Sequence, residues 1–293
     1  MQKIVAIVGP TCSGKTSLGI SASQAFNGEV LSADSRQVYT GLNIGSGKVT
    51  QHEMQGVPHH LLDVADPKEQ YSVARFRNDA LKAIADIHAR NKLPILVGGT
   101  GQYIDAVLYT QTIPEVPPNE ELRKRYETYD TPSLFKLIET KDPRRAQTIE
   151  RNNRRRLVRA LEIIEAVGVV PEQQPALPRF DHTIILLVIA KEELASKIHE
   201  RLIARLSEGM IEESQHLHQN GLPWERFEEL GLEYRYIKRH VTGELSYNEM
   251  VAQLEKQIVE YARRQRTWWR NRNDITPVAP TQVIECIKDF LEK

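Results

Sequence analysis

Residues 9–16, GPTCSGKT, have the spacing G-x-x-x-x-G-K-T of a phosphate-binding loop. The glycines of such a loop let backbone N–H groups converge on phosphate oxygens at the start of a helix. Lys15 adds a positive charge, and the hydroxyl of Thr16 is the usual magnesium ligand of this pattern. We predict a site for a phosphate or a diphosphate here, and the group attached to it stays open.

A carboxylate, Asp34, follows the second strand-like segment in SADSRQ. Parallel α/β sheets place their chemistry at the carboxyl ends of the strands, so Asp34 is expected beside the phosphate loop, where it could serve as a general base. The alternative is an ordinary N-cap or turn aspartate. A nucleotide hydrolase would also need an acid at the end of a later strand, but PILVGGTG (94–101) ends in glycines. This weakens the interpretation as an ATPase.

Positive charge is concentrated in two segments, although Lys+Arg and Asp+Glu both number 39. Residues 144–159 hold seven arginines against one acid, Glu150, and residues 261–273 hold five arginines and no acid. A solvated helix face is the usual alternative for such a run. With so little acid to pair with, we favour contact with RNA. In the second segment we expect Trp268 and Trp269 to pack in the core.

The elements that position these residues alternate between strand and helix over the first hundred residues. We predict buried strands at 3–8, 29–33 and 93–99, a further apolar segment near 61–64, and helices at 15–25 and 72–90. The fold class is therefore α/β, with a P-loop NTPase-like parallel sheet core.

Two proline-rich stretches, TIPEVPPNEE (112–121) and VPEQQPALPRF (170–180), enclose a helical, arginine-dense region. HTIILLVIA (182–190) then returns to a buried-strand pattern. We expect a catalytic core at 1–110 and 181–293 with an inserted all-helical domain at 111–180.

Cys12 and Cys286 are the only cysteines, which excludes a disulfide framework or a zinc set and fits a reducing compartment. The first strand begins near residue 3, so we expect no signal peptide, and no apolar run approaches the about 18 residues of a membrane span. We expect a cytoplasmic protein without membrane contact. The adjacent His59 and His60 lack a third ligand at metal-binding spacing and are interpreted as structural or substrate-proximal.

Six segments together resemble the tRNA dimethylallyltransferases, and in the same order: GPTCSGKTSL, LSADSRQVYTGLNIGSGK, HHLLDVADPKEQYSVARFR, PILVGGTGQYI, RNNRRRLVRALEI and YARRQRTWWR. The resemblance is to the bacterial form, because the zinc-finger extension typical of eukaryotic members does not follow. It implies transfer of a dimethylallyl group from dimethylallyl diphosphate to N6 of adenosine 37, beside the tRNA anticodon, with release of diphosphate. Mg²⁺ is the implied cofactor, tRNA and the donor are the implied partners, and a monomer is expected.

The resemblance also implies roles for individual residues. Asp34 would be the general base and Thr11 would help to position it, while Lys15 and Arg201 would hold the diphosphate. The implied diphosphate cradle is Gly9, Pro10, Thr11, Cys12, Ser13, Gly14, Lys15 and Thr16, with Thr16 as metal ligand. The implied tRNA contacts are Asp34, Ser35, Arg36, Gln37, Thr100, Gly101, Arg123, Arg155, Arg156, Leu157, Val158, Arg159, Arg263 and Arg264.

Three departures from the family pattern affect the fine substrate contacts. Gln102 stands where an apolar residue is usual, Cys12 replaces a small residue, and GLEYRY (231–236) replaces a commoner Gly-Tyr-Arg/Lys pattern. Rival interpretations are a P-loop kinase of a small metabolite, a prenyltransferase of free adenine nucleotides, and a non-catalytic RNA-binding protein. The long basic insertion argues against the second, since a free nucleotide needs no additional domain.

Overall fold

The structure of the protein is a computed structural model, and it describes residues 2–172, 175–270 and 272–293. Residues 173–174 of the second proline-rich stretch and Asn271 of the second basic segment lie outside the described residues. The chain divides into two compact units, a core unit of residues 1–109 and 178–293 and a helical unit of residues 110–177. Each unit is described by itself.

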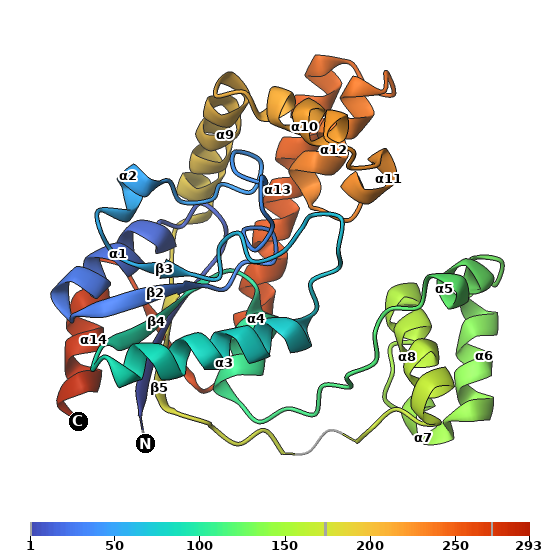
Figure 1. The fold of residues 1–293 in the computed structure, drawn as a ribbon, viewed down its shortest axis with the longest axis horizontal. Helices are drawn as coiled ribbons and strands as arrows, with labels where there is room; N and C mark the ends of the chain where they lie inside the picture. Colours follow the sequence, from blue (N-terminus) through green and yellow to red (C-terminus); the bar gives the residue numbers. More distant parts are fainter. Residues whose placement is uncertain (1, 173–174, 271) are drawn as a thin grey trace. The chain divides into compact units, whose positions relative to one another are not determined.

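The core unit is built on a parallel sheet, which confirms the predicted α/β fold class (Figure 1). Among the described residues the sheet has six strands in the order β3-β2-β4-β1-β5-β6. Central β1 pairs with β4 on one side and β5 on the other, so that Val8 lies opposite both Gly98 and Leu186. The strands are β1 (Lys3–Val8), β2 (Gly28–Ser32), β3 (His59–His60), β4 (Leu93–Gly98), β5 (Asp181–Leu187) and β6 (Ile275–Val278).

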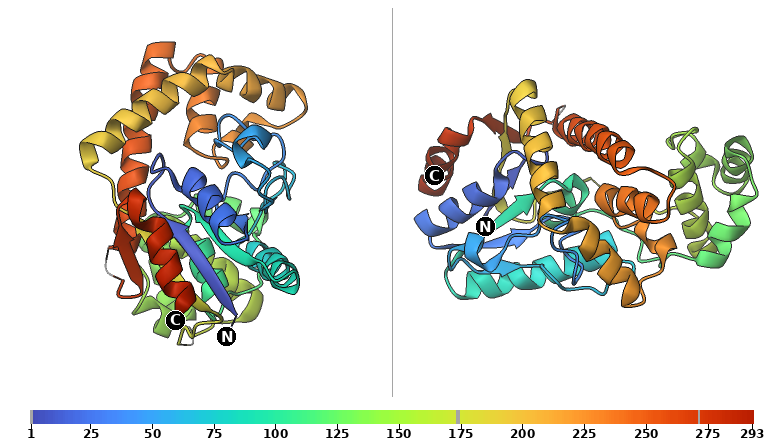
Figure 2. Two further views of the ribbon diagram at one scale, coloured as in Figure 1. Left: turned by 90° about the vertical axis from the view of Figure 1, so that its left-hand side faces the viewer. Right: turned by 90° about the horizontal axis from the view of Figure 1, so that it is seen from above.

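Helices cover both faces of the sheet because its strands are apolar on both sides. Alternate residues of β1 enter two separate clusters: Ile4 packs with the helices on one face and Val5 with those on the other. The first face carries α3 (Val73–Ala89) and α4 (Gly101–Leu108), and the second carries α1 (Lys15–Ala25) and α14 (Val283–Glu292). Figure 2 shows the two chain ends close together, and Lys3 Nζ donates hydrogen bonds to the carbonyls of Phe290 and Leu291.

A second layer of helices follows β5 and surrounds its own apolar cluster, which includes Leu202, Met210, Ile237 and Leu254. Its longest member, α13, starts at a capping box in which Ser246 and Glu249 satisfy each other's backbone N–H groups. The helices of this layer are α9 (Lys191–Ser207), α10 (Met210–Gln219), α11 (Trp224–Phe227), α12 (Leu232–Val241) and α13 (Tyr247–Trp269). The short elements α2 (Gln51–Met54) and η1 (Pro280–Gln282) complete the core unit.

The helical unit has a core of its own, in which Tyr126, Leu134 and Leu161 are buried. Its helices are α5 (Glu120–Glu127), α6 (Thr131–Lys141), α7 (Pro143–Ala146) and α8 (Arg154–Val167). Asn119, Asp130, Asp142 and Asn153 cap these helices by accepting hydrogen bonds from backbone N–H groups of the first turn.

The predicted apolar segment near 61–64 follows β3 and is not itself a strand, because Leu61 and Asp63 take left-handed backbone angles with φ of 66° and 55°. Two sequence-based expectations differ from the structure. Trp268 is 46 % exposed, whereas Trp269 is fully buried as expected. Leu157 is also fully buried in the helical unit, so its side chain supports the core and is not available to RNA.

Candidate active site

The phosphate loop connects the end of β1 to the start of α1. Gly14 takes a left-handed conformation (φ 82°) at the N-cap of α1, and no side chain of the described residues caps this helix. The first N–H groups of α1 are therefore free to bind an anion, which the helix dipole also favours. Cys12 reaches φ 61° in the same turn, a conformation that an L-residue adopts only under constraint from its surroundings.

Lys15 lies back across the loop, where its Nζ donates to the Pro10 carbonyl at 2.6 Å and to Ser13 Oγ at 3.5 Å. Burial, followed by the nearby charge of Arg201, lowers the pKa of Lys15 to about 8. The charge of Asp34 opposes this shift, so Asp34 and Lys15 share one electrostatic environment. The structure thus brings the predicted base and the predicted cradle lysine together.

Two arginines of α9 extend toward the cradle. Arg201 donates to Cys12 Sγ at 3.7 Å, so it lies beside the phosphate loop. Arg205, one helical turn later, was missed by sequence reasoning. Both line a small pocket, here called the arginine pocket, whose lining residues are Thr11, Cys12, Ile198, Arg201, Leu202, Arg205, Glu233 and Ile258.

Arg205 has an unused donor in this pocket. Its Nη2 is buried without a hydrogen-bond partner among the described residues, and burial lowers its pKa. Both guanidiniums also lie against Gly47, where an added Cβ would come within 1.3 Å of Arg205 Nη2 and 2.2 Å of Arg201 Nη2. A buried cation with an open donor is a ready site for an anion. The signal in the sequence was the i,i+4 spacing of the two arginines on one helix face.

Gln265 is a second residue that sequence reasoning missed. Its Oε1 accepts a hydrogen bond from the Thr11 amide at 2.8 Å, and its Nε2 donates to the Gly99 carbonyl at 3.1 Å. The side chain is 93 % buried and joins the cradle to the glycine-rich turn after β4. Gln265 shares the buried face of α13 with Ala262 and Trp269. This periodicity in the sequence could have indicated that its side chain is buried.

Asp34 follows β2, where the predicted strand-end position is confirmed. One carboxylate oxygen accepts from the Arg36 amide at 2.8 Å, and the Ser35 amide donates to Thr100 Oγ1 at 3.2 Å. This side-chain-to-backbone turn fixes the orientation of the carboxylate. Among the described residues the second carboxylate oxygen accepts no hydrogen bond, so it is open to a substrate proton.

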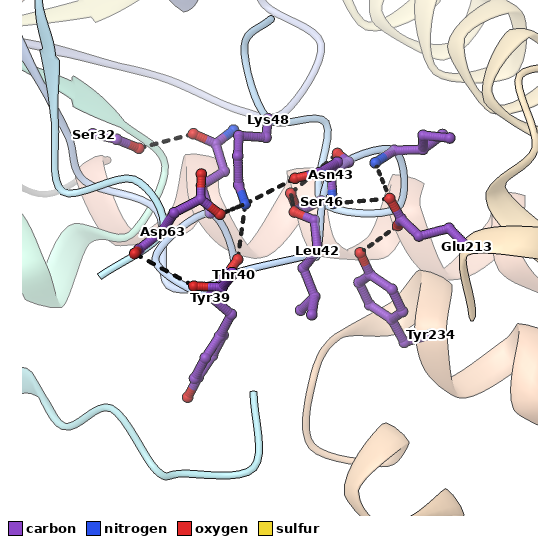
Figure 3. A network of polar contacts seen from close by, with 12 residues as sticks. Ser32, Tyr39, Thr40, Leu42, Asn43, Ser46, Lys48, Asp63, Glu213 and Tyr234 are labelled. Atoms are coloured by element: carbon purple, nitrogen blue, oxygen red, sulfur yellow. Dashed lines mark hydrogen bonds and ion pairs between the residues drawn. The ribbon is translucent and has the colours of Figure 1, made fainter. Parts of the chain in front are cut away.

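The loop after Asp34 is fastened at both of its sides (Figure 3). Glu213 of α10 accepts hydrogen bonds from the amides of Asn43, Ile44 and Gly45 at 3.0, 2.7 and 3.0 Å, and from the Tyr234 hydroxyl at 2.9 Å. Lys48 Nζ donates to the Tyr39 carbonyl at 2.8 Å and to Asp63 at 2.5 Å. The loop is therefore held in a fixed conformation, with Gly47 against the guanidiniums of Arg201 and Arg205.

The glycine-rich turn after β4 lies against the same region. A side chain at Gly98 would meet the Ala33 carbonyl at 2.2 Å, and one at Gly101 would meet Trp268 Nε1 at 2.2 Å. Glycine is required at both positions because neighbouring atoms occupy the space of a Cβ. Half-exposed Trp268 thus covers Gly101, and it lies beside a predicted RNA contact.

Most of the predicted RNA-facing arginines of the helical unit also have structural partners. Arg123 and Arg159 both pair with Glu162, at 2.8 and 3.2 Å, and this carboxylate is 1 % exposed. Arg154 donates to two backbone carbonyls at 2.6 Å each. The pairing of Arg159 with Glu162 corrects the expectation that this run has little scope for ion pairs, because the acid lies just beyond the run.

The remaining arginines are open to solvent. Arg155 and Arg156 are exposed, and Arg156 holds only an exposed ion pair with Glu150. With Arg145 and Arg159 they line a hollow of about 300 Å³ in the helical unit, whose floor is apolar. In the core unit Arg263 and Arg264 are exposed on α13.

His59 and His60 each contact a polar group of the protein. His60 Nε2 lies 2.7 Å from Glu29, and His59 Nδ1 lies 2.9 Å from the Val57 carbonyl. Within the described residues no three His, Cys, Asp or Glu side chains gather as a metal site. No helix in these same ranges is long and apolar enough to cross a membrane.

Comparison with known proteins shows which family this chain resembles. The family model described as IPP transferase matches residues 37–272. A tRNA dimethylallyltransferase 1 of Geotalea daltonii is 42 % identical over 266 residues, which are 91 % of this chain and 86 % of that protein. The crystal structure of a full-length tRNA isopentenylpyrophosphate transferase from Bacillus halodurans is 35 % identical with a TM-score of 0.75, covering 100 % of this chain and 97 % of the other.

A third comparison reaches beyond bacteria. A eukaryotic dimethylallyltransferase acting on tRNA superposes with a TM-score of 0.85 at 28 % identity, covering 100 % of this chain and 80 % of the other. The matched family region begins at Gln37 and contains both arginines of the arginine pocket, Gln265 and the glycine-rich turn. By its sequence and its fold, this chain belongs to the IPP transferase family.

Proposed function

We propose that the protein transfers the dimethylallyl group of dimethylallyl diphosphate to N6 of adenosine 37, beside the anticodon of tRNA, and releases diphosphate. The observation that carries this proposal is the pairing of an open anion cradle with a fixed carboxylate. Asp34 shares the electrostatic environment of Lys15, and Arg205 keeps a buried donor unused. The names of the relatives support the same reaction.

In this reaction the N6 amine forms a bond to C1 of the allylic group while the bond from C1 to the diphosphate oxygen breaks. The amine loses one proton, which Asp34 accepts as general base. Negative charge grows on the departing diphosphate, and Lys15, Arg201 and Arg205 stabilise it together with the N–H groups of α1. The leaving group carries away the electron pair of the broken bond.

Gln265 links the phosphate loop at Thr11 to the glycine-rich turn at Gly99. The Thr11 amide is already used by Gln265, so the backbone of the loop is fixed before any ligand arrives. Its hydroxyl remains for the base and the adenine. Preorganisation of this kind lowers the cost of binding and of reaching the transition state.

The site also suits Mg²⁺. Thr16 is exposed as the second residue of α1, so its hydroxyl can serve as a protein ligand. Mg²⁺ keeps several waters and takes phosphate oxygens together with a small number of protein ligands. When bound, the ion would neutralise charge on the diphosphate.

The tRNA would contact residues of both units. We assign Ser35, Arg36, Gln37, Thr100 and the Gly101 turn to the extruded adenosine, because a base must leave its stack to reach a buried reactive group. Arg155, Arg156, Arg263 and Arg264 would contact phosphates and stacked bases. We further propose that the protein acts as a monomer.

The test is incubation of the protein with tRNA, dimethylallyl diphosphate and Mg²⁺, followed by mass spectrometry of the tRNA nucleosides. The expected result is a gain of one five-carbon group on a single adenosine. Parallel reactions contain free AMP in place of tRNA, or ATP labelled in its γ-phosphate in place of the donor. Prenylated AMP with unmodified tRNA, or phosphate transfer to a small molecule, would refute the proposal.

A further inference from the structure

Glu233 is a carboxylate inside the arginine pocket to which the reaction proposed above gives no task. It lies in the first turn of α12, within the GLEYRY segment that departs from the family pattern, and 22 % of its side chain is exposed. Its Oε1 lies 3.8 Å from Arg205 Nη1. A negative charge beside a diphosphate site opposes binding unless it is paired or neutralised.

The first turn of α12 is held in place from the other side. The neighbouring Tyr234 is buried and donates its hydroxyl to Glu213, the same carboxylate that fastens the loop at Asn43–Gly45 (Figure 3). Gly47 of that loop lies against the guanidiniums of Arg201 and Arg205. Glu233 and the two arginines are therefore enclosed by rigid elements, and the pair cannot separate easily into solvent.

The charged groups that face Glu233 come from every element around the pocket. Burial raises the pKa of Glu233, Arg205 and then Arg201 oppose that shift, and Asp34 adds to it. Burial raises the pKa of Tyr234 and of Tyr261, and the charge of Glu233 adds to both shifts. In the free protein the Glu233 carboxylate is thus paired with Arg205 at 3.8 Å, and the charge of Arg201 adds to this attraction.

A diphosphate in the pocket would reverse this balance. It would draw the guanidinium donors of Arg205 and Arg201 to its own oxygens and add negative charge near Glu233. Both effects favour the neutral carboxylic acid. We propose that Glu233 is a positioning residue, which holds Arg205 in the free protein and takes up one proton from solvent when the donor diphosphate binds. This inference rests on the proposed function of the cradle.

The experiment measures proton uptake with inorganic diphosphate and Mg²⁺ as the probe. Isothermal titration calorimetry at pH 6.5 in buffers of different ionisation enthalpy gives the number of protons bound per ligand. Lys15 stays protonated at this pH because its pKa is about 8, and the protonation of diphosphate itself is common to all variants. Glu233→Gln is compared with the wild type and with Glu200→Gln, an exposed carboxylate of the same helix as the arginines.

The wild type and Glu200→Gln should take up more protons than Glu233→Gln, by a difference of up to about one. Above the free-state pKa of Glu233, wild-type affinity should fall by up to about tenfold per pH unit more steeply than that of Glu233→Gln. Infrared difference spectra of the wild type should gain a protonated-carboxyl band on adding diphosphate, and this band should be missing in the variant.

Equal proton uptake in the wild type and Glu233→Gln, or no new infrared band in the wild type, would overturn the role of Glu233. The infrared measurement needs no variant, so it stands even if Glu233→Gln folds poorly. If inorganic diphosphate does not bind the wild type at all, the diphosphate assignment of the cradle fails first. That result is distinct from binding without a proton.

Discussion

In the helical unit a carboxylate, Glu162, is buried between Arg123 and Arg159; in the core unit an arginine, Arg205, is buried with one nitrogen unused. The first arrangement is complete, because Glu162 also accepts from the Asn119 amide at 2.9 Å. The second arrangement is incomplete, because the carboxylate of Glu233 lies 3.8 Å from Arg205 Nη1, beyond hydrogen-bond distance.

The difference teaches how to separate structural charge from functional charge. Seven arginines cluster between residues 144 and 159 of the helical unit, yet several of them donate their hydrogen bonds to groups of the protein itself. The arginine pocket holds only two, and its chemistry follows from burial and missing partners. Removing a charge should therefore cost stability in the helical unit and ligand binding or turnover in the core unit.

The largest effect is expected at Asp34. Asp34→Ala should lower turnover by about 10²–10⁴-fold, because the amine loses its positioned proton acceptor. Since the carboxylate is not part of the cradle or of a hydrophobic cluster, donor and tRNA binding should persist. Single-turnover rates with separate binding titrations make the measurement, and a wild-type rate would remove Asp34 from the mechanism.

The next effect is structural. Glu162→Ala should destabilise the helical unit by about 3–5 kcal/mol, because Arg123 and Arg159 lose the buried carboxylate that neutralises their charges. Urea unfolding of the full chain is the readout. Diphosphate affinity should not change, and a loss of that affinity would contradict the separation drawn between the two units.

Arg205→Ala should act mainly on ligand binding. Diphosphate affinity should fall by about 10–100-fold, the worth of one hydrogen bond to a charged group, and stability should also fall to the extent that Glu233 loses its arginine partner at 3.8 Å. Arg159→Ala is the matched control. If it weakens diphosphate binding as much as Arg205→Ala does, the comparison between the two units is wrong.

Lys15 should make the core unit sensitive to pH. Its pKa of about 8 means that the amine is charged below pH 8 and loses its proton as the pH rises above it. The charged form binds the anion, so diphosphate affinity should fall above pH 8, by up to about tenfold per pH unit. Titrations between pH 6 and 9 test this, with Lys15→Met expected to flatten the upper part of the profile.

The smallest effect is expected from exposed arginines of the helical unit. Arg155→Ala with Arg156→Ala should weaken tRNA binding only a few-fold and reduce its salt dependence by about one unit of slope per lost phosphate contact. Stability should be unchanged, because the single ion pair of Arg156 is exposed at both ends. Unaltered salt dependence would remove these two side chains from the RNA surface.

Much of the sheet could be predicted because its strands are continuous apolar runs, as burial on both faces demands. KIVAIV and LPILVG appear as β1 and β4 within one residue of expectation. The segment 61–64 could not be assigned in this way. Its apolar residues resemble a strand, but left-handed angles at Leu61 and Asp63 depend on the loop around Lys48.

The cradle and Asp34 were visible because their spacing is local. Gln265 and Arg205 were not, since their partners lie far away in sequence: Gln265 contacts Thr11 across 254 positions. Glu233 appeared only as an irregularity in a motif. Sequence patterns record which residues share an element, whereas a site also needs the tertiary contacts between elements.

Gln265 also links the cradle to the order in which the chain is made. While the protein is being synthesised, β1 has no β5 beside it until residue 187 has emerged. The Thr11 amide has no side-chain acceptor until α13, which carries Gln265, has folded. Contacts between such distant residues form late, because a long loop must close first. A nascent chain therefore carries the complete phosphate-binding sequence without a fixed cradle until Gln265 has been added and α13 has folded.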